Sequence, residues 1–83
     1  GDLLIAISSS GESLNMINAA DTAHKLGLKV ITFTGFRKEN SLKKKGIINF
    51  WVDSNVYNYV EMVHHIWLVS LVDFIQKDKI NDN

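Results

Sequence analysis

Along the chain, three short apolar runs alternate with stretches of helical pattern. The apolar runs cover residues 3–7, 28–34 and 47–52, and each is nearly continuous instead of alternating with polar positions. Continuous runs of this length are typical of strands buried on both faces, as in parallel sheets. The sequence therefore predicts three strands of a parallel sheet, the first of them buried on both faces.

The helical stretches differ in how their apolar residues are distributed. In residues 12–26 apolar side chains recur at helical spacing with polar ones between them, which predicts an amphipathic helix. Gly27 follows as its C-terminal cap, because glycine tolerates the left-handed conformation. Residues 56–76, or a little beyond, are apolar over much of the helix circumference. Such a helix is either buried on several sides or packs against another subunit.

Between these helices, residues 36–46 form a polar loop in which we expect a short helical turn. Asn40 or Ser41 is placed to cap this turn and Gly46 to end it. The order is strand, helix, strand, short helix, strand, long helix, which is typical of an α/β architecture with a parallel sheet. We expect a domain portion over residues 1–79 and a polar tail over residues 80–83. Few helices cover this sheet, so we expect the fold to continue in further residues.

Composition excludes several classes of function. The 83 residues hold equal numbers of basic and acidic side chains, 9 of each, and no cysteine. The neutral balance gives no electrostatic argument for nucleic acid, so we interpret Lys43–Lys45 as a solvated surface. Without cysteine there is no disulfide framework and no thiolate zinc site. No apolar run approaches the roughly 20 residues of a membrane span. We therefore expect neither a nucleic-acid nor a membrane partner.

The segment IAISSSGES, residues 5–13, carries the clearest chemical signal. It places four hydroxyls and Gly11 where the first strand ends and the first helix begins. Ligands of parallel sheets bind at the carboxyl ends of strands, and a helix N-terminus offers unpaired N–H groups to an anion. A phosphate cradle is the favoured interpretation; the alternative is that Ser10 or Ser13 merely caps the helix. The spacing fits neither a nucleophile elbow nor a P-loop or dinucleotide fingerprint.

The chain also resembles a known family. GDLLIAISSSGESLNMINAADTAHKLGLKVITFTG resembles the second half of a sugar isomerase (SIS) domain, in particular its phosphoheptose isomerase branch, and the helix VEMVHHIW follows in the expected order. The resemblance implies a three-layer αβα, doubly wound, Rossmann-like parallel sheet, of which this chain would be the C-terminal half. It further implies that the phosphate of the substrate binds to residues 8–13, here called the serine loop. The matching positions are Ser8, Ser9, Ser10, Gly11 and Ser13.

The last helix departs from that family at positions that matter for chemistry. The heptose-phosphate isomerases carry a glutamine and, two turns later, a histidine in their metal and catalytic site; here Glu61 and Val69 stand there, and Asn58 matches a family aspartate. Glu61 and His65 are four residues apart and share a helix face. His65 is thus a candidate base or metal ligand in place of the absent histidine. His64 is rotated away and is the weaker candidate. The alternative is a polar pair at a buried subunit contact.

For the intact protein, the resemblance implies isomerisation of a ketose phosphate, similar to sedoheptulose 7-phosphate, to an aldose phosphate in the cytoplasm. It implies a phosphorylated sugar as ligand, a homo-oligomer (dimer or tetramer), and a zinc ion to which Val69 cannot contribute a ligand. The alternative is a non-catalytic phosphosugar sensor or assembly scaffold. Elsewhere, His24 is interpreted as a partly buried surface histidine, and Trp51 and Trp67 as core or interface aromatics.

Overall fold

The helices and strands follow the predicted order. The computed structural model describes the backbone of residues 2–81 and the side chains of residues 2–77. The elements are β1 (Leu3–Ile7), α1 (Leu14–Lys25), β2 (Lys29–Thr34), the short 3-10 helix η1 (Lys43–Lys45), β3 (Ile48–Trp51) and α2 (Tyr57–Asn81). Helix α1 begins two residues later than expected, and α2 continues past the expected end near Gln76. Residues 82–83 of the expected tail lie outside the described residues.

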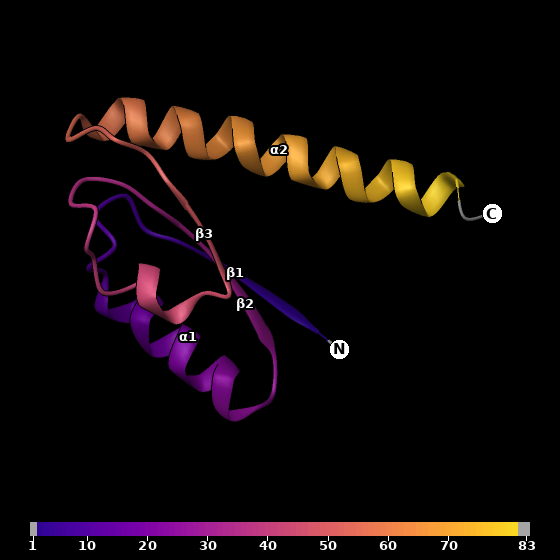
Figure 1. Cartoon of the computed structure of the whole chain (residues 1–83), viewed down its shortest axis with the longest axis horizontal. Helices are drawn as coiled ribbons and strands as arrows, with labels where there is room; N and C mark the ends of the chain where they lie inside the picture. Colours follow the sequence, from indigo (N-terminus) through magenta and orange to yellow (C-terminus); the bar gives the residue numbers. More distant parts are fainter. Residues whose placement is uncertain (1, 82–83) are drawn as a thin grey trace.

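The three strands form one parallel sheet in the order β1-β2-β3, with Ile5 beside Ile31 and Phe33 beside Phe50. Helix α1 and η1 lie on one face and α2 lies on the other, which confirms the α/β class and its layering (Figure 1). The expectation that β1 is buried on both faces is wrong for the described residues. Ile7 remains 37% exposed, because β1 is an edge strand and α2 packs mainly over β2.

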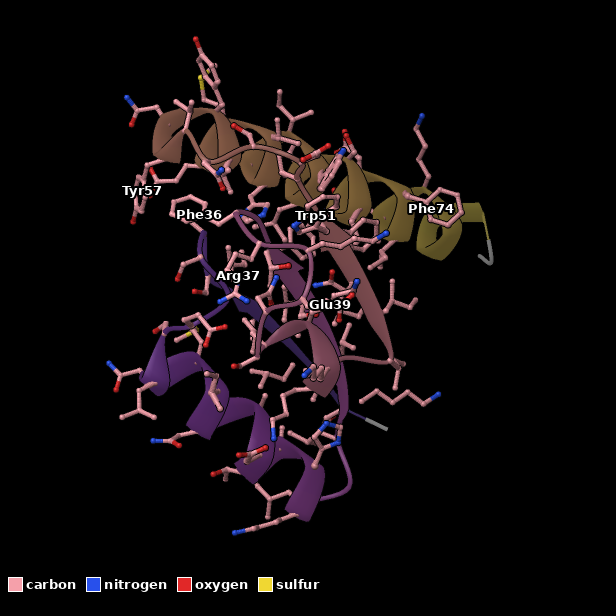
Figure 2. All side chains as sticks on the ribbon, turned by 60° about the vertical axis from the view of Figure 1, so that its left-hand side comes forward. Phe36, Arg37, Glu39, Trp51, Tyr57 and Phe74 are labelled. Atoms are coloured by element: carbon pink, nitrogen blue, oxygen red, sulfur yellow. The ribbon has the colours of Figure 1, made fainter. Side chains whose placement is uncertain are left out.

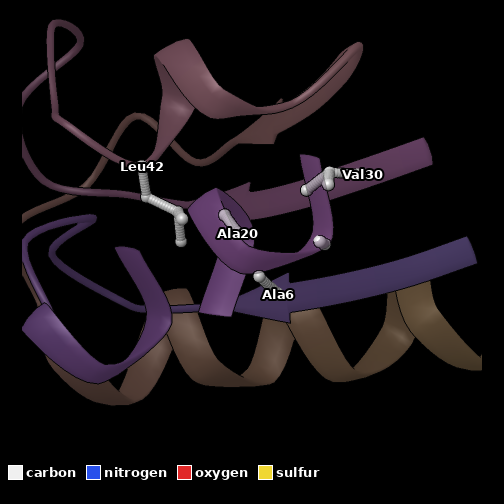
Figure 3. Close-up of a cluster of buried hydrophobic side chains, with 5 residues drawn as sticks. Ala6, Ala20, Val30 and Leu42 are labelled. Carbon is white, nitrogen blue, oxygen red and sulfur yellow. The ribbon is translucent and has the colours of Figure 1, made fainter. Parts of the chain in front are cut away.

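The core lies between the sheet and α1. Its buried side chains come from β1, β2, α1 and the loop before η1 (Figure 3): Ala6, Val30, Ala20, Ala23 and Leu42. Alanines on the helix allow a close approach to the strands, and Leu42 fills the space that they leave. The polar loop therefore contributes a fully buried side chain to the core.

Helix α1 ends as its sequence predicts. Gly27 adopts a φ of +77°, and the N–H of Leu28 donates to the carbonyl of Ala23 at 2.9 Å. This hydrogen bond and the one from Gly27 to His24 form a Schellman motif, which satisfies carbonyls at the helix end. Beside it His24 contacts the Lys45 carbonyl and is more exposed than expected, while Asp21 pairs with Lys45 at 2.9 Å.

Helix α2 packs on the sheet through one stripe of side chains. Val60 and His64 are buried, and Trp67 lies on Phe50 with ring centroids 5.7 Å apart, which agrees with the core interpretation of Trp67. The opposite face is exposed and carries Met62, Ile66 and Val69. Val72, Phe74 and Ile75 are exposed further along the helix, Phe74 and Ile75 on the same side as Val60 and Trp67. The C-terminal half of α2 extends past the strands (Figure 1). Within residues 2–81, neither helix combines enough length and apolar character to cross a membrane.

His64 joins α2 to the sheet by a directed hydrogen bond. Its Nε2 donates to the Thr34 carbonyl at 2.8 Å, which fixes the Nε2–H tautomer. Its Nδ1 is buried and has no hydrogen-bond partner among the described residues. A proton on Nδ1 would therefore be a buried donor without an acceptor. Burial lowers the pKa of His64, and this effect exceeds the opposing influence of the Thr34 hydrogen bond and of the Glu61 charge.

A polar network fixes the loop of residues 36–46 on β2. The amide of Asn40 donates to Thr34 Oγ1 and to the Arg37 carbonyl, each at 3.0 Å. Its Oδ1 accepts the N–H of Lys43, the first residue of η1, at 2.9 Å. The N-cap residue itself is Leu42 and not Asn40 or Ser41, the two that the sequence predicted. Asn40 is only 1% exposed, and these hydrogen bonds satisfy the polar groups that its burial removes from water.

The same loop clamps the serine loop. The Leu42 N–H donates to the Gly11 carbonyl at 2.9 Å, and Ser41 donates both its N–H and its hydroxyl to the Glu12 carboxylate, at 2.9 and 2.7 Å. The Ser41 hydroxyl, followed by the Ser41 N–H, lowers the pKa of Glu12. Gly11 has a φ of +72°, and a Cβ built there would lie 2.1 Å from Asn40 Oδ1. The contacts between the two loops therefore require glycine at position 11.

Replacing Gly11 by alanine should destabilise the full-length protein more than replacing Gly27. Both positions have positive φ, which costs alanine about 1–2 kcal/mol. Only Gly11 adds a collision with a buried side chain, typically about 1–3 kcal/mol more. Urea denaturation of Gly11→Ala and Gly27→Ala measures the difference in unfolding free energy. Equal losses of unfolding free energy in the two variants would show that Asn40 can move aside at little cost and that the contact between the two loops is not tightly packed.

The unfolding free energy should decrease as the pH falls from 7.5 to 5.5, partly because of His64. The unfolded histidine takes up a proton near pH 6.5 and the folded one only at lower pH, so stability is lost below about 6.5. The slope for one proton is at most about 1.4 kcal/mol per pH unit. His64→Gln retains a donor for the Thr34 carbonyl without titrating, while His24 and His65 remain. The variant should show a weaker pH dependence; an identical one would contradict this role.

Candidate functional site

A cavity of about 450 Å³ opens where β1 ends, between the serine loop and α2. One wall is the end of β1 with the serine loop, and the other is the first half of α2. The lining residues are Ile7, Ser8, Ser9, Ser10 and Ser13 on the first wall and Tyr57, Glu61, His64, His65 and Leu68 on the second. The structure thus brings the serines together with Glu61 and His65, although the two groups are about fifty residues apart in sequence.

Two of the serines shape their own loop. Ser8 is buried, and its Oγ accepts the N–H groups of Gly11 and Ser13, at 3.1 and 3.4 Å. Ser10 Oγ accepts the Glu12 N–H at 3.1 Å. Each hydroxyl uses its oxygen as acceptor in these bonds, so its proton is still free to be donated. These bonds curl the loop and hold the hydroxyls on the cavity side.

Capping does not explain the serines. Ser13 is the residue before α1, yet its side chain makes no capping hydrogen bond; only its carbonyl takes part, accepting the Ile17 N–H at 2.9 Å. Ser10 bonds Glu12, which precedes the helix. The N–H groups of the first helical turn therefore have no partner within α1. They lie beside Ser13, at the positive end of the helix dipole.

Gly11 takes a different place from the serines. It is the one predicted phosphate position that does not line the cavity, because it is buried beneath Asn40. Its positive φ and its lack of a Cβ serve the contact with the loop of residues 36–46. The resemblance counts Gly11 among the phosphate-binding positions, whereas in the structure its conformation serves the contact with Asn40.

On the α2 wall, the lining residues recur every three or four positions. Glu61 and His65 are both exposed and share the face that the four-residue spacing predicts. His64, ranked below them from the sequence, also lines the cavity, from its buried position against β2. Sequence reasoning missed Tyr57, although it stands one turn before Glu61. Asn58 borders a shallower groove on the outer side of Glu61 and His65.

The described residues do not complete a metal site. No three histidine, cysteine, aspartate or glutamate side chains gather closely enough to hold an ion within the part of the chain that the structure describes. Glu61 and His65 offer two donors, whereas a catalytic zinc ion takes three protein ligands. Val69, at the position of the family histidine, is an exposed hydrocarbon. The residues described here therefore do not fit the zinc ion by themselves.

Comparison with known proteins agrees with this architecture. The family model described as "SIS domain" matches residues 1–35, which contain β1, the serine loop, α1 and β2. The matched segment ends at Gly35, directly after β2, and contains Ile7 at the end of β1, which lines the cavity. The match therefore includes the whole serine wall of the site.

Several phosphoheptose isomerases are similar to the chain. That of Aliarcobacter butzleri is 37% identical over 78 residues, which are 94% of this chain and 41% of the relative. That of Escherichia coli is 32% identical, covering 96% of this chain and 42% of the relative. In Buchnera aphidicola the identity rises to 59% over 34 residues. The chain spans about two fifths of the length of the first and second of these relatives. The chain is therefore similar to the SIS domain family over its first 35 residues and to phosphoheptose isomerases along nearly its whole length.

Proposed function

We propose that the full-length protein binds a phosphorylated sugar in this cavity and interconverts ketose and aldose phosphates. The observation that carries the proposal is the meeting of two kinds of chemistry in one cavity: hydroxyl and N–H donors on one wall, and a carboxylate with an imidazole on the other. The similarity to proteins named phosphoheptose isomerase supports the same substrate class.

In this proposal the phosphate lies against the serine wall. Ser9, Ser10 and Ser13 donate their hydroxyl protons to phosphate oxygens, and the first N–H groups of α1 face the same charge. Ser8 has mainly a structural role, because its side chain is buried, unlike those of the other three serines, and its oxygen holds the N–H groups of Gly11 and Ser13. Among the side chains of residues 2–77, no lysine or arginine lines the cavity, so hydrogen bonds and the helix dipole provide the attraction.

The carbon chain of the sugar then extends toward α2. Interconversion of a ketose and an aldose moves a proton between two adjacent carbons and another between their oxygens. The Glu61 carboxylate is a base of the kind that takes and returns the carbon-bound proton, and His65 is suited to exchange the oxygen-bound proton. In enzymes that use a metal ion for this reaction, the ion would polarise the carbonyl of the substrate.

We also propose how this piece fits into its protein. The relatives are more than twice as long, which supports a chain that is one portion of a larger domain. In this proposal residues 1–79 are the C-terminal portion of a SIS domain, as the resemblance implies, and residues 80–83 are a polar tail, of which residues 80–81 continue α2. The exposed apolar face of α2 supports assembly into a dimer or tetramer. A cytoplasmic location is proposed by analogy with sugar-phosphate metabolism.

A non-catalytic phosphosugar sensor or scaffold is the second candidate. It is favoured by Val69, which removes a side chain that the resemblance associates with the metal and catalytic site. A sensor needs the serine wall but has no use for proton transfer at Glu61 and His65. The two candidates therefore make the same prediction for the serines and opposite predictions for α2.

Replacing Ser13 by alanine in the full-length protein should weaken binding of sedoheptulose 7-phosphate about ten-fold, because a hydrogen bond to a charged oxygen is worth about 1.5–3 kcal/mol. Ser13 suits the test because its hydroxyl makes no capping bond whose loss would weaken α1. Ser70→Ala, on the exposed side of α2, is the matched control. Calorimetric titration measures both affinities, and equal affinities in the two variants would contradict a phosphate at the serine wall.

The double change Glu61→Gln and His65→Asn separates an isomerase from a sensor. It retains side-chain size and most hydrogen bonding but removes proton-transfer capacity. Turnover of ketose phosphate to aldose phosphate should fall about 100-fold or more, the usual scale of general acid–base catalysis. Affinity for the phosphosugar should remain within about two-fold, a difference of less than 1 kcal/mol. Unchanged turnover would place the catalytic base outside this helix.

A further inference from the structure

An unusual backbone conformation stands at the edge of the cavity. Phe36 has a φ of 59°, in the left-handed region that aromatic residues seldom adopt. It directly follows Gly35, where β2, the serine loop and α2 converge. A Cβ built on Gly35 would lie 2.6 Å from Val60 Cγ1 and 2.9 Å from the Ser9 carbonyl oxygen. The chain therefore turns sharply at the point where the two walls of the cavity meet.

Two contacts hold Phe36 in this conformation. Its N–H donates to the Ser54 carbonyl at 3.0 Å, which ties the loop to the segment between β3 and α2. Its ring meets the ring of Tyr57 edge to face, with centroids 6.4 Å apart and planes at 77°. Figure 2 shows the two rings side by side at the start of α2. Backbone strain of this kind persists only where the surroundings over-determine it, and it gathers at functional sites.

Tyr57 gains little from this contact as a structural residue. It is 56% exposed, so burial does not explain why a strained neighbour should support its ring. It does, however, line the cavity, one helical turn before Glu61. A ligand whose phosphate lies on the serines and whose carbon chain meets Glu61 has Tyr57 beside that chain. An aromatic face packs on C–H groups of a sugar, and a phenol hydroxyl bonds its hydroxyls.

We propose that Tyr57 is a specificity-determining residue that contacts the polyhydroxylated chain of the ligand, and that Phe36 is the residue that positions it. The inference rests on the proposed function, since it takes a sugar phosphate to be the ligand. In this proposal two parts of the site contact different parts of the ligand. The serine wall binds the phosphate, and the Phe36–Tyr57 pair recognises the carbon chain, which distinguishes one sugar phosphate from another.

The test compares two probes, sedoheptulose 7-phosphate and inorganic phosphate, in titrations of the full-length protein. Tyr57→Ala should weaken binding of the ketose phosphate about ten-fold, the effect of losing an aromatic contact and a hydrogen bond. Binding of inorganic phosphate should not change. Tyr57→Leu, which keeps an apolar side chain at the start of α2, should behave in the same way. Tyr59→Ala is the control, because Tyr59 is 62% exposed on the same helix and does not line the cavity.

Changes at Phe36 test the positioning role. Phe36→Gly removes the ring and the strain together, so the denaturation midpoint should be unchanged or raised while ketose-phosphate affinity falls several-fold. Phe36→Tyr keeps the edge-to-face contact and should retain the affinity. If the Phe36→Gly protein loses affinity for both probes equally, Phe36 has a merely structural role, and the proposal that it positions the Tyr57 ring is overturned.

The outcomes separate this inference from the proposed function. If the unchanged protein binds the ketose phosphate and Tyr57→Ala binds it equally well, the role of Tyr57 is overturned and the proposed function stands. If the unchanged protein binds inorganic phosphate but shows no preference for the ketose phosphate, both are overturned.

Discussion

Thr34 is the residue on which both walls of the cavity depend. Its hydroxyl accepts the amide of Asn40 at 3.0 Å and thereby anchors the loop that clamps the serine loop. Its carbonyl accepts His64 of α2 at 2.8 Å and the N–H of Val52 at 3.0 Å. Thr34 is fully buried at the carboxyl end of the central strand, where an unpaired polar group would be costly. These partners are therefore held in fixed positions.

The residues of the site therefore fall into two groups: buried residues that hold the walls in place, and exposed residues that are available to a ligand. Residues that shape the walls are buried and bonded, as Ser8, Asn40 and His64 are. Residues proposed to meet the ligand are partly or fully exposed, as Ser9, Ser13, Glu61 and Tyr57 are. Chemistry at a site needs side chains that are free to bond a ligand on a support that does not move. The network around Thr34 provides that support, and within residues 2–77 its buried side chains include no lysine, arginine, aspartate or glutamate.

Local patterns in the sequence predicted the elements and part of the site, and long-range contacts account for the rest. Apolar runs predicted the strands, Gly27 predicted the end of α1, and the cluster of hydroxyls predicted the serine wall of the cavity. The function of Gly11 escaped prediction because its partner, Asn40, lies 29 positions away and leaves no periodic signal. Helical spacing placed Glu61 and His65 on one face, but it could not say that His64 faces the sheet and also borders the cavity. The exposure of β1 depends on where α2 packs, which no local pattern encodes.

The most direct measurement is a crystal structure of the full-length protein with sedoheptulose 7-phosphate bound. We expect the phosphate within hydrogen-bond distance of the hydroxyls of Ser9, Ser10 and Ser13, at the N-terminus of α1. We expect the carbon chain of the sugar along α2, beside Tyr57 and Glu61. A phosphate bound away from the serine loop, or a sugar chain directed away from α2, would contradict the proposed site.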